Sequence, residues 1–306
     1  MILLLPLLAA ALSVTSDARG RDNGLDLAPY GAANLTGVMV DSRITESSGL
    51  AVSMIETGRF WTHNDGGNEP LIFAIGSDGS RQGYVRLAAV ENLDWEDLTA
   101  FMLDGQSYLG IADVGDNGAV RKTLSILLIK EPENPRGQSV KPDRVLSFRL
   151  EGGPRDIESA AFDVNDRAFY LLAKRGYPPY LYRLPWPDED AHGLQTATRV
   201  GTVAAIPQPK PIDQKTDPKG WRYRSQPTAM DFSSDGRRAV VLTYRHAYLF
   251  QRRDQESWAA AMARAPQLIK LPALPQSEGI AFDPEGRILI STEKWPAPLL
   301  MIQPTQ

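Results

Sequence analysis

Short apolar strands separated by polar turns recur along most of the chain, and one phrase begins each group of strands. In this phrase an oxygen-bearing residue is followed by small and apolar residues. Its copies begin at Ser48, Glu96, Glu158, Thr228 and Glu278. Regular repeats of short strands and turns are typical of a β-propeller, in which each repeat forms one blade. The pattern therefore predicts an all-β, five-bladed β-propeller.

The strand count predicts how the ring closes. Four repeats contain four apolar strands each, but the fifth ends after its third strand, at residues 299–302. A spare strand at residues 36–40 precedes Ser48, and we expect it to complete the last blade and remove the open sheet edges. Two departures from the repeat are expected: a polar insertion at residues 207–226 and an alanine-rich helix at residues 255–265.

The amino-terminal residues predict export. Residues 1–16 contain an apolar run that is too short to span a bilayer and is followed by small residues, as in a signal peptide. The run lacks a preceding Lys or Arg, so a hydrophobic anchor or a misplaced start is the alternative. We expect a linker at 17–33, the propeller at 34–306, a periplasmic or secreted location, and no transmembrane segment.

Composition narrows the possible functions. The chain has 306 residues, a net charge of −4 and no cysteine. A negative net charge gives no sign of the basic surface that nucleic-acid binding requires. The lack of cysteine excludes disulfides, thiol catalysis and cysteine-ligated zinc. Gly-x-Ser-x-Gly, Walker and Gly-x-Gly-x-x-Gly motifs are also absent from the sequence.

The lead residues predict a metal site on the propeller axis. The first strand of each blade lines the channel, so Ser48, Glu96, Glu158, Thr228 and Glu278 should converge near one mouth. Carboxylates about 5 Å apart repel by roughly 3 kcal/mol per pair at an effective dielectric of about 20. A bound cation would relieve this repulsion, and a set of hard oxygen donors favours Ca²⁺. The alternative is that the glutamates pair with channel arginines or cap neighbouring backbone.

Polar residues at the ends of the second strands reach the same mouth. They form a set with acidic residues on one side and basic residues on the other, and could bind an anionic small molecule beside the cation. The residues expected to bind it are His63, Asn64, Lys174, Arg175, Tyr244, Arg245 and Lys294. An equally weighted alternative is that the mouth charges pair across the channel and hold the blades together.

Two functions from different classes follow from this arrangement. The first is a calcium-binding propeller that binds a ligand or partner at its mouth. The second is a calcium-dependent hydrolase of phosphoester or ester bonds, with Asp65, Asp116 or Glu293 as the general base. The loops that carry Asp65 and Asp116 are rich in Asn, Asp and Gly, and a shaped connection is the simpler interpretation of each.

The order of lead residues resembles a known type of propeller. The phrases at residues 46–50 and 277–281 are similar to those of five-bladed propellers with an axial calcium, namely the SdiA-regulated family of exported bacterial proteins and the calcium-activated nucleotidases. Residues 64–68 and 94–97 resemble phrases of uncharacterised exported bacterial propellers. The resemblance implies that the lead residues ligate calcium or hold its waters. The nucleotidases' substrate residues are not recognised here, so their activity is not carried over.

Overall fold

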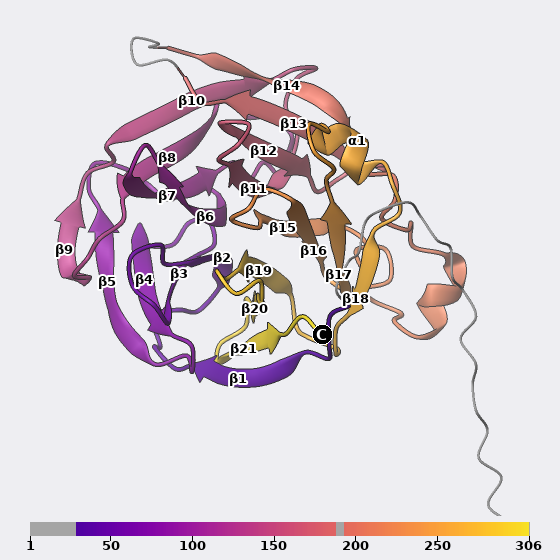
Figure 1. Ribbon diagram of the computed structural model, residues 1–306, viewed down its shortest axis with the longest axis horizontal. Coiled ribbons are helices and arrows are strands. Elements are labelled where there is room, and N and C mark those ends of the chain that lie inside the picture. Colours follow the sequence, from indigo (N-terminus) through magenta and orange to yellow (C-terminus); the bar gives the residue numbers. More distant parts are fainter. Residues whose placement is uncertain (1–28, 188–192, 306) are drawn as a thin grey trace, which may run out of the picture.

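The computed structural model describes residues 29–187 and 193–305, and it is an all-β fold. Its sheets surround a common centre, as in a β-propeller (Figure 1). The predicted signal peptide and most of the predicted linker lie outside the described residues. No helix in the described residues has both the length and the apolar character needed to cross a bilayer.

The strands form four hydrogen-bonded sheets. The first contains β2 (Ser47–Val52), β3 (Arg59–Asn64), β4 (Leu71–Gly76), β5 (Arg81–Leu87) and β9 (Arg136–Val140). The second contains β6 (Trp95–Leu103), β7 (Gln106–Asp113), β8 (Leu124–Lys130), β10 (Arg144–Leu150), β11 (Ile157–Asp163), β12 (Ala168–Ala173), β13 (Tyr180–Pro185) and β14 (Gln195–Thr202). The third contains β15 (Pro227–Phe232), β16 (Arg238–Thr243), β17 (His246–Gln251) and β18 (Gln267–Lys270). The fourth contains β19 (Ser277–Phe282), β20 (Ile288–Thr292), β21 (Ala297–Ile302) and β1 (Asn34–Met39).

The first strands of the repeats line the centre of the molecule. β2, β6, β11, β15 and β19 contact one another in a closed ring, and each begins an antiparallel group of strands that runs outward. The last group is completed by β1, which pairs antiparallel with β21. The amino-terminal strand therefore joins the carboxyl-terminal group, as the sequence predicts.

The outer strands contain two pairings that the sequence pattern does not reveal. β10 and β14 pair in parallel and merge two groups into the eight-stranded sheet. β9 pairs in parallel with β5 and covers the outer edge of the first sheet. Parallel contacts between separate repeats depend on loop lengths, which hydrophobic alternation does not encode.

The helix predicted at residues 255–265 is shorter than expected. Only α1, Trp258–Met262, is helical, and Ser257 caps it by accepting a hydrogen bond from the Ala260 amide at 3.2 Å. Gln255 has a φ of 60°, a left-handed conformation that prevents the helix from extending back to it. In the 207–226 insertion the regular structure is the short 3₁₀ helix η1, Pro211–Lys215.

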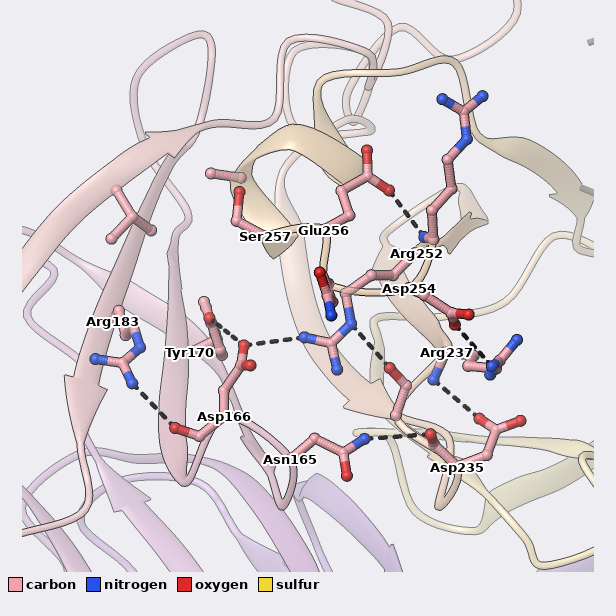
Figure 2. A pocket seen from close by; sticks show the side chains of 15 residues that line it. Asn165, Asp166, Tyr170, Arg183, Asp235, Arg237, Arg252, Asp254, Glu256 and Ser257 are labelled. Carbon is pink, nitrogen blue, oxygen red and sulfur yellow. Dashed lines mark hydrogen bonds and ion pairs between the residues drawn. The ribbon is translucent and has the colours of Figure 1, made fainter. Parts of the chain in front are cut away.

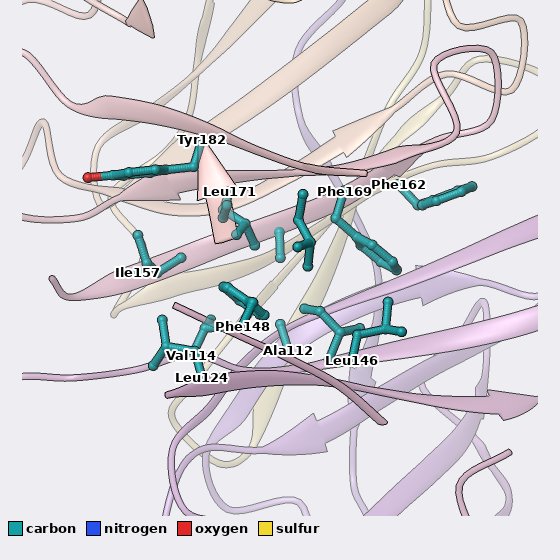
Figure 3. Close-up of a cluster of buried hydrophobic side chains, with 14 of the residues drawn as sticks. Ala112, Val114, Leu124, Leu146, Phe148, Ile157, Phe162, Phe169, Leu171 and Tyr182 are labelled. Atoms are coloured by element: carbon teal, nitrogen blue, oxygen red, sulfur yellow. The ribbon is translucent and has the colours of Figure 1, made fainter. Parts of the chain in front are cut away.

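The core lies between neighbouring sheet groups. Figure 3 shows one cluster, in which Phe148, Phe162, Phe169 and Leu171 pack together from the three strands β10, β11 and β12. The rings of Phe101 and Phe162 stack with centroids 4.0 Å apart. Because the apolar faces are buried between groups, the ends of the inner strands and the loops remain available for polar groups.

Two aspartates connect the inner strands through hydrogen bonds to backbone amides. Asp97 on β6 accepts hydrogen bonds from the amides of Leu98, Ala160 and Met230 at 2.9, 2.9 and 3.0 Å. Asp231 on β15 accepts from the Phe282 amide at 2.8 Å. Asp97 thus connects three inner strands, and Asp231 connects two. We call Asp97 and Asp231 the axial aspartates.

Candidate metal centre and mouth pocket

Each inner strand has a β-bulge at or next to its lead residue. The strand register shifts between Trp95 and Asp97, and equivalent shifts occur in β11, β15 and β19. The extra residues in these four bulges are Glu96, Glu158, Thr228 and Glu278. In β2 the shift lies between Ser48 and Leu50, so Gly49 is the extra residue and Ser48 precedes it. Bulges redirect side chains, and in these four strands the extra residue is the predicted lead residue.

The two lead hydroxyls bond to backbone. Ser48 Oγ donates to the Glu96 carbonyl, and Thr228 Oγ1 donates to the Ser277 carbonyl, each at 2.7 Å. Each hydroxyl therefore connects its own inner strand to the next one around the ring. These contacts favour the backbone-capping alternative for Ser48 and Thr228, although each oxygen keeps lone pairs that could face an ion.

Glu158 and Glu278 are buried and have partners from the neighbouring second strands. Lys174 Nζ lies 2.8 Å from Glu158 Oε1, and the Tyr244 hydroxyl donates to Glu278 Oε1 at 2.8 Å. Burial, with the charges of Glu293 and Glu158, raises the pKa of Glu278 to about 8. Burial raises the pKa of the Glu158 carboxyl too, and the Lys174 ammonium opposes that rise.

Glu96 lies in a tight group with two other carboxylates. Asp65, Asp94 and Glu96 each offer an oxygen, and these oxygens lie within 4.8 Å of one another. Burial, followed by the charge of Asp65, raises the pKa of Asp94 to about 6. Burial and the charges of Glu158, Asp65 and Asp94 raise the pKa of Glu96 well above its usual range. We call Asp65, Asp94 and Glu96 the carboxylate cluster.

The loops that bring the cluster together are fixed by an asparagine. Asn92 Nδ2 donates to the carbonyls of Asn64 and Asp65 at 3.1 and 2.8 Å, and its Oδ1 accepts from the Trp95 amide at 3.1 Å. Asn92 therefore holds the end of β3 against the start of β6. This contact places Asp65 beside Asp94, which the sequence pattern did not assign to the site.

Glycine makes room for the cluster. A Cβ atom at Gly115 would lie 2.2 Å from Glu96 Oε1 and 2.5 Å from Asp94 Oδ2. A Cβ atom at Gly66 would lie 2.4 Å from Asp94 Oδ1. The carboxylates thus pack directly against two backbone segments, and a larger residue at either position would displace them. This close fit is suited to a small ligand such as a metal ion.

Several other predicted residues have contacts that support the fold. His63 is fully buried, burial lowers its pKa to about 4, and its Nδ1 lies 3.0 Å from the Asn64 carbonyl oxygen. The Asn64 side chain bonds to the backbone of Arg43, Thr45 and Glu46. These contacts favour a structural role for both residues.

The other two predicted general bases, Asp116 and Glu293, lie outside the carboxylate cluster. The Asp116 carboxylate accepts from the amides of Val120 and Arg121, each at 2.8 Å, and so shapes its own loop. Glu293 Oε2 lies 3.6 Å from Lys294 Nζ at the mouth. Of the predicted general bases, Asp65 is the one that belongs to the carboxylate cluster.

A pocket of about 620 Å³ lies at the mouth, and four predicted ligand-binding residues line it. They are Lys174, Arg175, Tyr244 and Arg245. The opposite wall comes from the insertion at residues 207–226 and includes Tyr223 and Arg224. We call this cavity the mouth pocket. Lys174 lines it and also contacts Glu158, so the pocket adjoins the ring of lead residues.

A second cavity, of about 710 Å³, lies between β12, β13 and the segment leading to α1 (Figure 2). Its charged residues are largely paired with one another. Arg252 contacts Asp163 at 2.8 Å and Asp166 at 2.9 Å, and Arg237 contacts Asp254 at 2.7 Å. Figure 2 shows the contacts of Arg252 with Asp166 and of Arg237 with Asp254. This cavity is remote from the lead residues, and its contacts hold two groups of strands together.

Comparisons with known proteins give a distant likeness. No protein-family model matches the chain, and no curated protein matches it. One similar solved structure is the PQQ-bound aldose sugar dehydrogenase from Streptomyces coelicolor, at 9% identity and a TM-score of 0.48, covering 90% of this chain and 98% of that one. Another is the apo form of the soluble aldose sugar dehydrogenase from Escherichia coli, at 9% identity and a TM-score of 0.46, covering 89% and 99%. At this similarity neither protein indicates what the present chain binds.

Proposed function

We propose that the chain is an exported, calcium-binding, five-bladed β-propeller that binds an anionic small molecule at its mouth. The observation that carries the proposal is the carboxylate cluster, three acidic oxygens within 4.8 Å of one another beside a pocket lined with basic residues. The closed ring of five inner strands supports the count of five blades. Export rests on the amino-terminal sequence alone.

The donor set supports calcium. Asp65, Asp94 and Glu96 supply hard carboxylate oxygens, which Ca²⁺ prefers, and His63 is not among the grouped donors. Mutual repulsion raises the free energy of the ionised cluster, and a divalent cation would remove that cost. Glu158, which lies close enough to raise the pKa of Glu96, is the lead residue best placed to complete the site.

The mouth pocket would receive the ligand. Lys174, Arg175, Arg224 and Arg245 line it, and Tyr244 offers a hydroxyl. The cation and the pocket are connected through Lys174, whose ammonium lies against Glu158. An anion in the pocket would therefore lie near both the basic residues and the bound ion.

Metal analysis of the purified protein tests the proposal. We expect about one calcium per chain by elemental analysis, and we expect the Glu96→Gln variant to lose it while it still folds. Asp116→Asn is the matched control, because Asp116 bonds to its own loop amides. Retention of calcium by Glu96→Gln, or its equal loss in both variants, would count against the cluster as the site.

A calcium-dependent hydrolase is the second candidate, and one observation favours it. Glu293 lies at the mouth outside the carboxylate cluster, and burial raises its pKa above its usual range, which suits a group that accepts a proton. Assays on nucleotides, phosphoesters and lactones with and without chelator separate the two functions. Turnover that requires calcium and is abolished by Glu293→Gln, with calcium binding retained, would establish the hydrolase.

A further inference from the structure

The mouth pocket continues into a second lobe beneath the insertion. The second lobe has a volume of about 460 Å³, and it shares Lys174 and Gln226 with the mouth pocket. Tyr177 and Trp221 line this outer lobe. The two lobes adjoin at these shared residues, between the 207–226 insertion and the ends of the second strands, and together they are called the cleft below. A cleft of two adjoining lobes is suited to a ligand made of more than one unit.

The charges of the inner lobe nearly cancel. Lys174 pairs with Glu158 at 2.8 Å, Arg175 with Asp156 at 2.8 Å, and Arg224 with Asp213 at 2.7 Å. Arg245 has no carboxylate at ion-pair distance among the residues that the structure describes. In the inner lobe it is therefore the basic group that a ligand could engage without breaking an ion pair, and Arg222, which lies over the Trp221 ring, is the corresponding group in the outer lobe. Two guanidiniums in separate lobes match carboxylates on neighbouring units of a ligand, whereas a polyphosphate needs several free cations close together, and the inner lobe also contains the carboxylate of Asp217.

The cleft also presents aromatic rings and amides. Tyr223 is 54% exposed and Tyr177 is 41% exposed, values that are high for such large side chains. The Tyr177 hydroxyl donates to the Ile206 carbonyl at 2.5 Å, which holds its ring in place against the insertion. Gln226 and Gln276 add amide donors and acceptors to the inner lobe. Flat apolar rings with neighbouring amides match the two sides of a sugar, its C–H face and its hydroxyl edge.

We propose that the cleft binds a short oligosaccharide of uronic acids, with a carboxylate on Arg245 and a sugar ring against Tyr223. This inference rests on the proposed function, because it names the class of anion at the same mouth. A guanidinium with two parallel donors fits a carboxylate. The outer lobe, with Trp221 and Tyr177, would hold the neighbouring sugar.

Calorimetric titration with uronic-acid trimers tests the inference. The probes are trimers of galacturonate, glucuronate and mannuronate, with maltotriose as the neutral trimer and ATP as the polyphosphate. We expect at least one uronate trimer to bind roughly 10-fold to 100-fold more tightly than maltotriose, since a charge-assisted pair is worth that much. Failure of all three trimers to bind, or tighter binding of ATP, would overturn the proposal.

Two variants and one control assign the binding to the cleft. Arg245→Gln should reduce uronate affinity roughly 10-fold or more and bring it close to that of maltotriose. Tyr223→Ala should weaken both sugars. Arg237→Gln, in the remote cavity, should change neither. Unchanged uronate binding in Arg245→Gln would also overturn the proposal, provided that melting curves show the variant to be folded.

Calcium titration of the same samples separates this inference from the function on which it rests. Normal calcium binding without uronate binding would overturn the ligand class and leave the calcium site standing. Uronate binding without calcium binding would support the cleft and contradict the carboxylate cluster as a metal site.

Discussion

The inner strands and their loops carry two sets of carboxylates, and the two sets differ in what surrounds their oxygens. The axial aspartates Asp97 and Asp231 accept hydrogen bonds from backbone amides of neighbouring inner strands. In the carboxylate cluster at the mouth, Asp65, Asp94 and Glu96 lie against one another. The first set connects strands, whereas the second set concentrates negative charge. These surroundings indicate a structural role for the axial aspartates, and they are the basis on which a binding role is proposed for the cluster.

Shifted pKa values do not make this distinction. Burial raises the pKa of Asp231 to about 7 and that of Asp94 to about 6. The shifts are similar because desolvation is the largest cause in both cases. The two sets should differ in their response to an added cation. The cluster should bind it, whereas the axial aspartates, whose oxygens accept hydrogen bonds from backbone amides, should not.

The largest expected effect is the loss of an axial carboxylate. Asp97→Ala would leave the buried amides of Ala160 and Met230 without acceptors and open a small void in the channel. We expect the free energy of unfolding to fall by about 3–5 kcal/mol. Chemical denaturation measures it, and Asp97→Asn, which keeps one acceptor oxygen, should lose distinctly less. A loss below about 1 kcal/mol for Asp97→Ala would contradict the structural role.

The second-largest effect is expected when a carboxylate of the cluster is removed. Glu96→Gln should weaken calcium binding about 100-fold, because a ligand and a charge are removed together. It should leave the stability of the metal-free protein unchanged or slightly higher, because repulsion with Asp94 and Asp65 falls. Calorimetry and melting curves in chelator measure the two quantities. A destabilisation as large as that of Asp97→Ala would place Glu96 in the structural set instead.

The pH dependence of stability should be opposite to that of a protein held by ion pairs. A carboxyl whose pKa is raised in the folded state favours folding when protonated, so stability falls as pH rises from the unfolded to the folded pKa. For Asp94 the window runs from 3.8 to about 6, and for Glu278 from 4.5 to about 8. Metal-free protein should therefore be less stable at about pH 8 than at about pH 5. After allowance for solvent screening at half-exposed Asp94, its share is of order 1 kcal/mol.

Calcium gives the control for this pH effect. A calcium ion bound by the cluster would stabilise its ionised form, so saturating calcium should remove the contribution of Asp94 and leave that of amide-bonded Asp231. The same slope with and without calcium would show that the cluster does not hold the ion.

A smaller effect is expected from filling the space behind the cluster. Gly115→Ala places a methyl group 2.2 Å from the present position of Glu96 Oε1, so the carboxylates must move. We expect calcium affinity to fall roughly 10-fold, with a change in the free energy of unfolding of about 1 kcal/mol. Gly118→Ala is the matched control in the same loop, where the nearest side-chain atom is 3.6 Å from the added carbon. Equal affinities for the two variants would contradict the proposed position of the ion.

The repeat pattern predicts the inner strands well because each one must bury the same small apolar residues at the centre. It also predicts that β1 completes the last group, since an unpaired edge would otherwise remain. The parallel pairing of β10 with β14 could not be predicted, because it depends on how far the connecting segments reach. The helix was predicted too long, because alanine content does not reveal the left-handed backbone at Gln255.

The residues of the carboxylate cluster, our candidate site, could be predicted from the sequence only in part. Glu96 is common to the predicted ring and to the carboxylate cluster, and Asp65 was considered only as a general base. Asp94 was missed, although it begins the phrase at residues 94–97, because its place depends on the contact of Asn92 with the end of β3. The alternation of apolar and polar residues also could not predict the bulges at the lead residues, because it assumes that every strand is regular.

Calorimetric titration of chelator-treated protein with calcium tests the central claim most directly, when wild type is compared with Asp94→Asn and with Asp231→Asn. We predict one calcium per chain in wild type and in Asp231→Asn, and a loss of binding in Asp94→Asn. Full binding in Asp94→Asn, or its loss in Asp231→Asn alone, would contradict the division between mouth and axial carboxylates.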